Sequence, residues 1–323
     1  MFVYFTTVRR KRSVKEGGEL IQLNWEDKQL IQSIPLFPSD PDIIYDPNPR
    51  GNSRGGKGVI KYNNELLVGT YHTILVFDCN LRFKRKISNN LFVNIHEMDI
   101  VGEHIWVSST GIDCVLLVDL NGNTLQSWWP REIPLLQNTF GLSPMNIDKA
   151  CDNRIRYLHG EMSNRDSHVH LNCVTNCREK TYILLNKLGV FVQIRPELKL
   201  IIHDKNIRGA HSARILDNGE VVVFCGSFKK RLLFYALKDG VLIKEIELLK
   251  FPEIKQLYKN YPDQPYNKSI FVRGLDIINN RRLLLGISPA SIIEIDIVHE
   301  MLVDFFQYST DVGDAVHGLA HIY

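Results

Sequence analysis

The stretch AHSARILDNGEVVVF, residues 210–224, sets the plan that the rest of the chain repeats. A short polar strand leads into an Asp-Asn-Gly turn and then into a more apolar strand, which is typical of a tight β-hairpin. Four further segments have the same plan: GKGVIKYNNELLVGT (56–70), IHEMDIVGEHIWVSS (95–109), VHLNCVTNCREKTYILL (169–185) and VRGLDIINNRRLLLG (272–286). The chain is therefore built from a repeated β unit.

A third strand follows the hairpin in most units, as in TILVFD (73–78), VLLVDL (115–120), LLFYAL (232–237) and SIIEIDI (291–297). A fourth strand usually comes next, and helical periodicity is nearly absent. Four-stranded units that recur about every 40 residues are typical of a β-propeller.

The two ends of the chain complete one another. The last residues, AVHGLAHIY (315–323), look like a first strand with nothing after it, and FVYFTTVRR (2–10) looks like a second strand with no first. Pairing them would close the ring and remove its edges. We expect an all-β fold, a single six-bladed propeller over residues 1–323, with five blades as the alternative. The expected blades are 56–90, 95–130, 169–205, 210–250, 272–308, and 315–323 with 2–36.

Histidines gather at one aligned position of the repeat. The first strand of each propeller blade lines the central channel, so residues at the start of these strands converge at one mouth. In blade order the aligned residues are Lys57, His96, His170, His211, Arg273 and His317. Four of the 11 histidines of the chain fall on these six positions, which favours a functional site over chance.

Other polar residues stand near this ring in the sequence. We expect Arg214, Asn172, Arg54 and Tyr258 to contact a substrate, and Glu97, Asp99, Asp276 or Glu161 to accept the second N–H of ring histidines. For Asp99 and Asp276, a bond to the backbone of a neighbouring strand is an equal alternative. The long connections 36–55, 128–168 and 249–270 lead to the same mouth, and the helix-like segment 252–261 is expected to fold over it.

Composition excludes several classes of protein. The chain is 44% apolar and 23% charged with a net charge of +3, which fits an ordinary globular protein. The basic cluster 9–12 is interpreted as a solvated hairpin turn, and no pattern suggests nucleic acid binding. Dinucleotide and P-loop signatures are absent, so no nucleotide cofactor is expected. No membrane helix or secretion signal is seen, and the six cysteines lack paired spacing, so we expect a cytoplasmic protein with reduced thiols.

The motifs FVRGLDIINNRRLLLGIS (271–288), AHSARILDNG (210–219) and IHEMDIVGEHIWVSSTG (95–111) resemble a bacterial propeller family of unassigned function that is often linked to secondary metabolism. The resemblance spans roughly residues 55–320 and implies the propeller fold. The ring of six channel residues, taken alone, is similar to the channel rings of two other classes of propeller enzyme. Carotenoid-cleavage oxygenases hold iron with four channel histidines, although they have seven blades. Arylsulfate sulfotransferases have six blades with channel histidines and an arginine, although they are exported.

Three functions remain open on this evidence. The first is a metal-dependent enzyme, in which His96, His170, His211 and His317 bind Fe, Mn, Zn or Cu, while Lys57 and Arg273 bind an anionic or carrier-bound small molecule. The second is a metal-free transfer or acid–base enzyme that uses the same side chains. The third is a non-catalytic propeller that binds a peptide or carrier protein.

Overall fold

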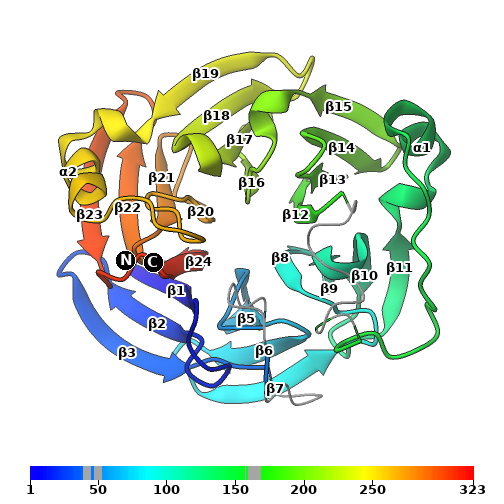
Figure 1. Cartoon of the computed structure of the whole chain (residues 1–323), viewed down its shortest axis with the longest axis horizontal. Coiled ribbons are helices and arrows are strands. Elements are labelled where there is room, and N and C mark those ends of the chain that lie inside the picture. The colour runs from blue at the N-terminus through cyan, green and yellow to red at the C-terminus, as the bar shows by residue number, and fades with distance from the viewer. Residues whose placement is uncertain (39–44, 47–52, 157, 159–168) are drawn as a thin grey trace.

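Six four-stranded antiparallel sheets stand around a central channel in the computed structural model, which describes residues 1–38, 45–46, 53–156, 158 and 169–323 (Figure 1). The six-bladed propeller predicted from the repeat is confirmed. In five of the sheets the strands run in chain order from the channel outwards, and in the sixth the last strand of the chain is innermost, followed by the first three.

Blades 1 to 5 are each formed by consecutive strands. Blade 1 contains β4 (Val59–Tyr62), β5 (Glu65–Gly69), β6 (Thr73–Asp78) and β7 (Phe83–Ser88). Blade 2 contains β8 (Ile95–Val101), β9 (His104–Ser109), β10 (Cys114–Val118) and β11 (Thr124–Trp128). Blade 3 contains β12 (Leu171–Cys177), β13 (Lys180–Leu185), β14 (Val190–Arg195) and β15 (Lys199–His203). Blade 4 contains β16 (Ala213–Ile215), β17 (Val221–Gly226), β18 (Arg231–Ala236) and β19 (Leu242–Glu247). Blade 5 contains β20 (Gly274–Ile277), β21 (Arg282–Ile287), β22 (Ser291–Asp296) and β23 (Met301–Gln307).

Blade 6 joins the two ends of the chain and closes the ring. It contains β24 (Asp314–Ile322), β1 (Phe2–Arg9), β2 (Glu19–Asn24) and β3 (Gln29–Pro35). The innermost strand β24 pairs antiparallel with β1, from Phe2 opposite Ile322 to Arg9 opposite Asp314. The two termini therefore lie side by side in Figure 1. Through this pairing β1 has a partner on both sides, and β24 becomes the innermost strand of the blade.

The hydrophobic core is divided among the contacts between blades. In the described part of the chain, six clusters of buried apolar side chains each lie between two neighbouring blades. The alternation along each strand explains this arrangement, because successive side chains point to opposite faces of a sheet and each face meets the next blade. The ring is thus held by packing between its blades.

Hydroxyl groups join neighbouring blades at the channel at three of the six junctions. Thr6 Oγ1 donates to the carbonyl of Lys57 at 2.8 Å, and Ser227 Oγ donates to the carbonyl of Val272 at 2.6 Å. Thr110 Oγ1 does the same for Leu171, at 2.5 Å. Each acceptor lies at or just before the start of an innermost strand. The bonds therefore fix the backbone that carries the channel residues.

Two helices lie on the outer rim of the ring, α1 (Pro134–Phe140) and α2 (Pro252–Asn260). The segment 252–261 does form a helix with Pro252 in its first turn, as predicted. Its predicted place over the channel mouth is wrong, because Ile254 and Leu257 are buried between blades 4 and 5. Within the described ranges, no helix is long and apolar enough to cross a membrane.

Candidate functional site

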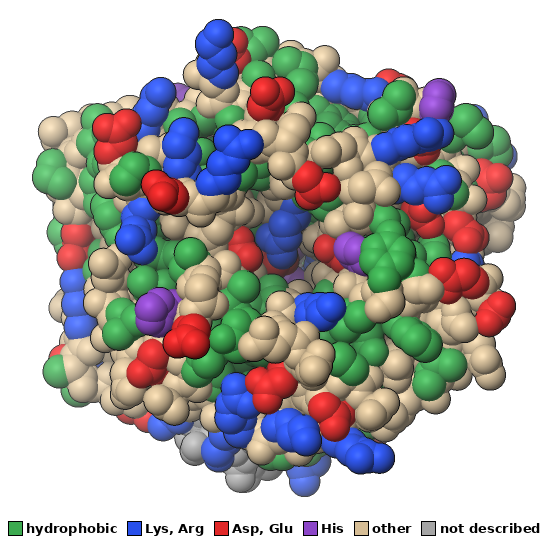
Figure 2. Space-filling model, turned by 180° about the vertical axis from the view of Figure 1, so that it is seen from behind, with side chains coloured by type: hydrophobic (Ala, Val, Ile, Leu, Met, Phe, Trp, Pro, Cys, Tyr) green, Lys and Arg blue, Asp and Glu red, His purple; other side chains and the backbone are tan. Residues whose placement is uncertain are grey.

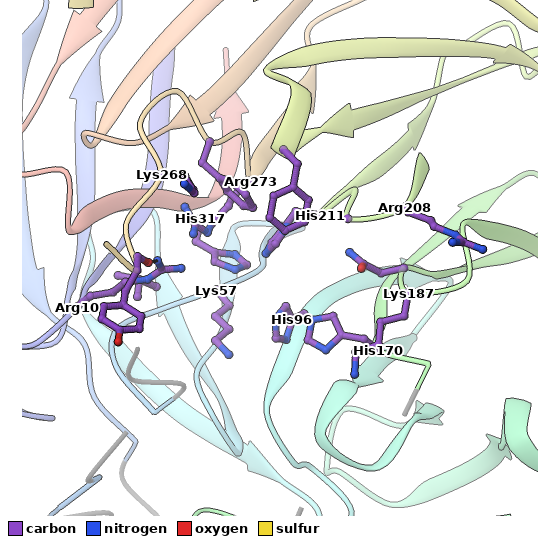
Figure 3. A pocket seen from close by; sticks show the side chains of 16 residues that line it. Arg10, Lys57, His96, His170, Lys187, Arg208, His211, Lys268, Arg273 and His317 are labelled. Carbon is purple, nitrogen blue, oxygen red and sulfur yellow. Dashed lines mark hydrogen bonds between the residues drawn. The ribbon is translucent and has the colours of Figure 1, made fainter. Parts of the chain in front are cut away.

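All six ring residues line one cavity at the channel, with a volume of about 530 Å³ (Figure 3). His96 and His317 belong to β8 and β24. The remaining four stand just before the first strands of blades 1, 3, 4 and 5: Lys57, His170, His211 and Arg273. The repeat therefore brings together residues that are more than 250 positions apart in the sequence.

Three of the histidines form a compact cluster. One ring nitrogen from each of His96, His211 and His317 lies within 4.8 Å of the others. The ring centroids are 5.7 Å apart for His96 and His317, and 6.0 Å apart for His211 and His317. His170 lies beside this cluster, with its ring centroid 5.3 Å from that of His96. Hereafter the three-His cluster means His96, His211 and His317.

Left-handed backbone turns deliver several ring residues into the channel. Gly55, Asn94 and Gly209 have φ angles of 63°, 55° and 81°, and each stands two positions before a ring residue. At Gly209 the left-handed conformation favours glycine, and a Cβ atom there would displace the Phe228 ring, which it would approach to 2.1 Å. His170 is itself left-handed, with φ of 56°, and Asp113 accepts hydrogen bonds from its backbone N–H and from that of Val169.

Asn94 links two ring residues. Its backbone carbonyl accepts a hydrogen bond from Nδ1 of His96 at 3.1 Å. Its side-chain oxygen accepts a hydrogen bond from Nζ of Lys57. Because a carbonyl can only accept, Nδ1 of His96 carries the proton and Nε2 keeps its lone pair. Asn94 is 2% exposed and was not singled out from the sequence, where no motif marks it.

The three-His cluster is electrically neutral near pH 7. Burial lowers the pKa of His96, His211 and His317 well below the usual value, and nearby cations add to the effect. For His96 the next contribution comes from Lys57, and for His211 it comes from Arg273. Neutral imidazoles can bind metal ions or accept protons.

Two Nδ1 atoms of the cluster lie buried without a hydrogen-bond partner among the described residues, those of His211 and His317. Leaving a buried polar atom unpaired costs free energy, and such an atom often marks the place of an ion or ligand. His317 is only 5% exposed, so solvent does not readily satisfy it. The cluster is thus suited to an occupant.

Lys57 is also buried in the cavity, and it is 4% exposed. Burial lowers its pKa to about 7, an effect that Asp46 opposes and that Arg273 and Arg10 reinforce. Asp46 itself is paired with the guanidinium of Arg54 at 3.1 Å. Near neutral pH the amine of Lys57 therefore exchanges readily between its charged and neutral forms.

Sequence reasoning missed a set of basic residues around the cavity. Among its described lining residues there is no Asp or Glu, and the added cations are Arg10, Lys187, Arg208 and Lys268. Arg10 belongs to the cluster interpreted as a solvated turn, yet it donates to the carbonyl of Tyr266 at 2.7 Å and reaches the cavity. Arg10 does lie in a partly exposed turn, as interpreted, but its contribution to the cavity was not foreseen. The missed residues lie on connections, outside the aligned repeat.

Aromatic rings form one wall of the cavity. The Phe271 ring lies edge-on to the His211 ring, with centroids 5.0 Å apart, and to that of Phe228 at 5.2 Å. The guanidinium of Arg273 lies 4.4 Å from the centroid of the Phe271 ring. Phe228 remains 64% exposed, an uncommon state for a phenylalanine beside a cavity. The wall offers apolar contact next to positive charge.

Three of the expected neighbours lie outside the lining of the cavity and bind one another or the backbone. Arg214 forms a 2.8 Å ion pair with Glu97, and burial raises the pKa of the Glu97 carboxyl, against the effect of Arg214. Asn172 donates to the carbonyl of Ala210 at 3.1 Å. On the face opposite to that of Figure 1 the centre of the ring is hollowed, and both basic and acidic side chains lie near the hollow (Figure 2).

The matching residues Asp99 and Asp276 bond to the neighbouring blade. Asp99 accepts from the backbone N–H of Asn176 at 2.6 Å, and Asp276 accepts from that of His321 at 2.7 Å. Asp276 also contacts Nδ1 of His321 at 2.8 Å. In the structure both carboxylates thus join innermost strands, the structural alternative that the sequence left open.

The other two expected substrate contacts are not among the residues that line the cavity. Arg54 pairs with Asp46 and donates to the carbonyl of Arg12 at 2.7 Å. Tyr258 lies on α2 and packs against the core between blades 4 and 5. Glu161 lies outside the described residues.

The comparisons with known proteins establish the fold alone. No family model matches the chain, and no curated protein matches it. A protein of unknown function from Bacteroides caccae superposes with a TM-score of 0.58 at 11% identity, over 98% of this chain and 97% of that one. A chain of a nidogen–laminin complex also gives 0.58, at 9% identity and with the same coverage.

Proposed function

We propose that the protein is an enzyme that acts on a small anionic molecule in the channel cavity and that the three-His cluster holds a divalent transition metal. The observation that carries the proposal is the approach of three imidazole nitrogens to within 4.8 Å of one another. Metal–nitrogen bonds of about 2 Å place ligand nitrogens about 3.3 Å apart in a tetrahedral site. Small rotations of the three side chains would close the remaining distance.

The chemistry of the cluster fits such an ion. Imidazole suits Fe, Zn and Cu, and three protein ligands leave a coordination position for substrate or water. The carbonyl of Asn94 accepts the N–H of His96 Nδ1 and so fixes the tautomer of this histidine, as acceptors around metal-bound histidines commonly do. Such an ion would polarise a substrate group or acidify a bound water.

Positive side chains would select the substrate. Lys57 and Arg273 are buried in the cavity beside the cluster, and Arg10 lies at its edge. A carboxylate, phosphate or sulfate group is stabilised by such donors, most strongly where water is excluded. The volume of about 530 Å³ is that of a small-molecule site. The proposal includes a substrate from bacterial secondary metabolism, which is supported by the sequence resemblance alone. It also includes a cytoplasmic location, which is supported by the six free cysteines.

Metal analysis of the purified protein tests the proposal. We expect about one equivalent of a transition metal per chain, and its loss in His317→Ala. The control is His104→Ala, which removes an exposed histidine of the same propeller. Protein that neither contains nor takes up a transition metal would overturn the metal-dependent proposal.

A metal-free enzyme is the second candidate, and the cations favour it. Arg273 and Arg10 lie close enough to lower the pKa of Lys57, and the same positive field would weaken the binding of a metal cation. In this case the neutral histidines would act as base or nucleophile on an anion held by the basic residues. Catalysis that persists after complete metal removal would favour this candidate.

A further inference from the structure

The amine of Lys57 is isolated from acidic partners inside the cavity. It donates a hydrogen bond to the amide oxygen of Asn94, a neutral group. The carboxylate of Asp46 is engaged by Arg54 and by the hydroxyl of Ser53 at 2.6 Å. Among the described residues no carboxylate forms an ion pair with Lys57. Structural lysines are rarely buried without one.

Its surroundings differ from those of the other cavity lysines. Lys187 and Lys268 are exposed, and Lys268 pairs with Asp263 at 3.5 Å. Lys57 is buried near Arg273 and Arg10, which together with desolvation lower its pKa to about 7. A desolvated lysine beside other cations is the setting in which an amine becomes a nucleophile at neutral pH.

We propose that Lys57 is a catalytic nucleophile that forms an imine with a small aldehyde or ketone carrying an anionic group. The inference rests on the proposed function to the extent that it takes the cavity for an active site. It does not depend on the metal. The guanidinium of Arg273, in the same cavity, would hold the anionic group of the substrate.

The reaction needs no oxidant or further reactant. The lone pair of Nζ attacks the carbonyl carbon, the C–O π bond breaks, and one proton moves from nitrogen to oxygen to give a carbinolamine. The C–O bond then breaks and the oxygen leaves as water, taking up a second proton, while nitrogen loses its remaining proton as the C=N bond forms. The net change is amine plus carbonyl to imine plus water. His170, which lines the same cavity outside the three-His cluster, is the imidazole that would relay these protons.

Reductive trapping tests this inference. The protein is incubated with pyruvate and borohydride, digested, and mapped by mass spectrometry. We expect one reduced adduct, located on Lys57, which forms at least tenfold faster than any adduct on Lys268. Lactate has the same charge but no ketone, and it should give none. Treatment with a metal chelator should not prevent the adduct.

Variants separate the outcomes. Lys57→Met and Lys57→Arg should both abolish the adduct. The arginine variant retains the charge and a donor to Asn94, so it is expected to fold even if the methionine variant does not. Lys61→Met, which replaces an exposed lysine of β4 outside the cavity, should keep the adduct. Equal labelling of exposed lysines, or no adduct in the folded wild-type protein, would overturn the role of Lys57. Metal content is measured on the same samples. A missing adduct with metal bound would contradict the role of Lys57 alone, whereas an adduct without bound metal would contradict the metal site alone.

Discussion

Asn94 holds His96 through its backbone carbonyl at 3.1 Å and, through its side chain, also holds Lys57. A single buried residue in a left-handed conformation thus fixes two cavity groups of different chemistry. The side-chain bond favours the charged form of Lys57, because the amide oxygen accepts from the ammonium.

Replacing Asn94 should separate its two roles. Asn94→Gly keeps the left-handed backbone and loses the bond to Lys57, so the pKa of Lys57 should fall further below its value of about 7. The pH dependence of Lys57 acylation, followed by mass spectrometry, measures this shift. Asn94→Ala loses the same bond and adds strain of about 1 kcal/mol, which denaturant unfolding would detect. An unchanged pKa in both variants would show that Asn94 does not position Lys57.

The ion pair of Glu97 and Arg214 should be sensitive to removal of one partner. Glu97→Gln leaves the partly buried guanidinium of Arg214 without its ion-pair partner, and we expect a loss of at most about 3–5 kcal/mol in the free energy of unfolding, because Asp99 remains nearby. Glu97→Gln with Arg214→Met should recover much of it. The control Glu103→Gln changes an exposed carboxylate of the same blade and should have little effect. Equal losses in the single and double variants would contradict this interpretation.

Lys57 should make stability depend on pH in the alkaline range. In the unfolded chain its amine keeps its proton up to about pH 10.4, whereas in the folded chain burial lowers the pKa to about 7. Between these values the unfolded state binds more protons, so the Lys57 contribution becomes more favourable as pH rises. The Lys57→Met variant should therefore be more stable than the wild type, by about a few kcal/mol at most. This difference in stability should be largest below pH 7 and should shrink towards pH 10.

Denaturant titrations at several pH values give this difference directly. The control Lys61→Met replaces an exposed lysine on β4 of the same blade, and its difference from wild type should be small and nearly constant with pH. A Lys57→Met difference that is constant or grows with pH would show that the amine is not destabilised by burial.

Removal of β24 should open the ring. Deleting residues 315–323 exposes the edge of β1 and removes Val316 and Leu319 from the apolar cluster between blades 5 and 6, which uncovers their neighbours Val3, Phe5 and Leu284. We expect insoluble protein, whereas loss of Tyr323 alone, which is 82% exposed, should be tolerated. The soluble fraction and the cooperativity of thermal melting measure the outcome. A soluble, cooperatively melting deletion variant would argue against closure by the termini.

The sequence predicts the fold and the ring well because both follow from the repeat. Aligned strands carry His96, His211 and His317 to equivalent positions, so their meeting in the channel follows from symmetry. Connections do not repeat, and their contacts are not encoded in spacing. Arg10 is held at the cavity by a hydrogen bond to the carbonyl of Tyr266, and these two residues are over 250 positions apart in the sequence.

The misplaced helix has a physical explanation that the sequence did contain. Ile254 and Leu257 are three residues apart, so they share one face of α2, and that apolar face packs between two blades. Arg54 is different, because its engagement by Asp46 depends on the path of a long connection.

Cobalt titration tests the central claim most directly. Co²⁺ bound by three imidazoles gives visible absorption bands that differ from those of the hydrated ion, so binding can be followed without knowledge of the substrate. We predict saturation at one equivalent per chain in the wild type and in His104→Ala, and loss of the bands in His96→Ala, His211→Ala and His317→Ala. Absence of saturable binding by folded wild-type protein, or full binding by the three cluster variants, would contradict the metal site.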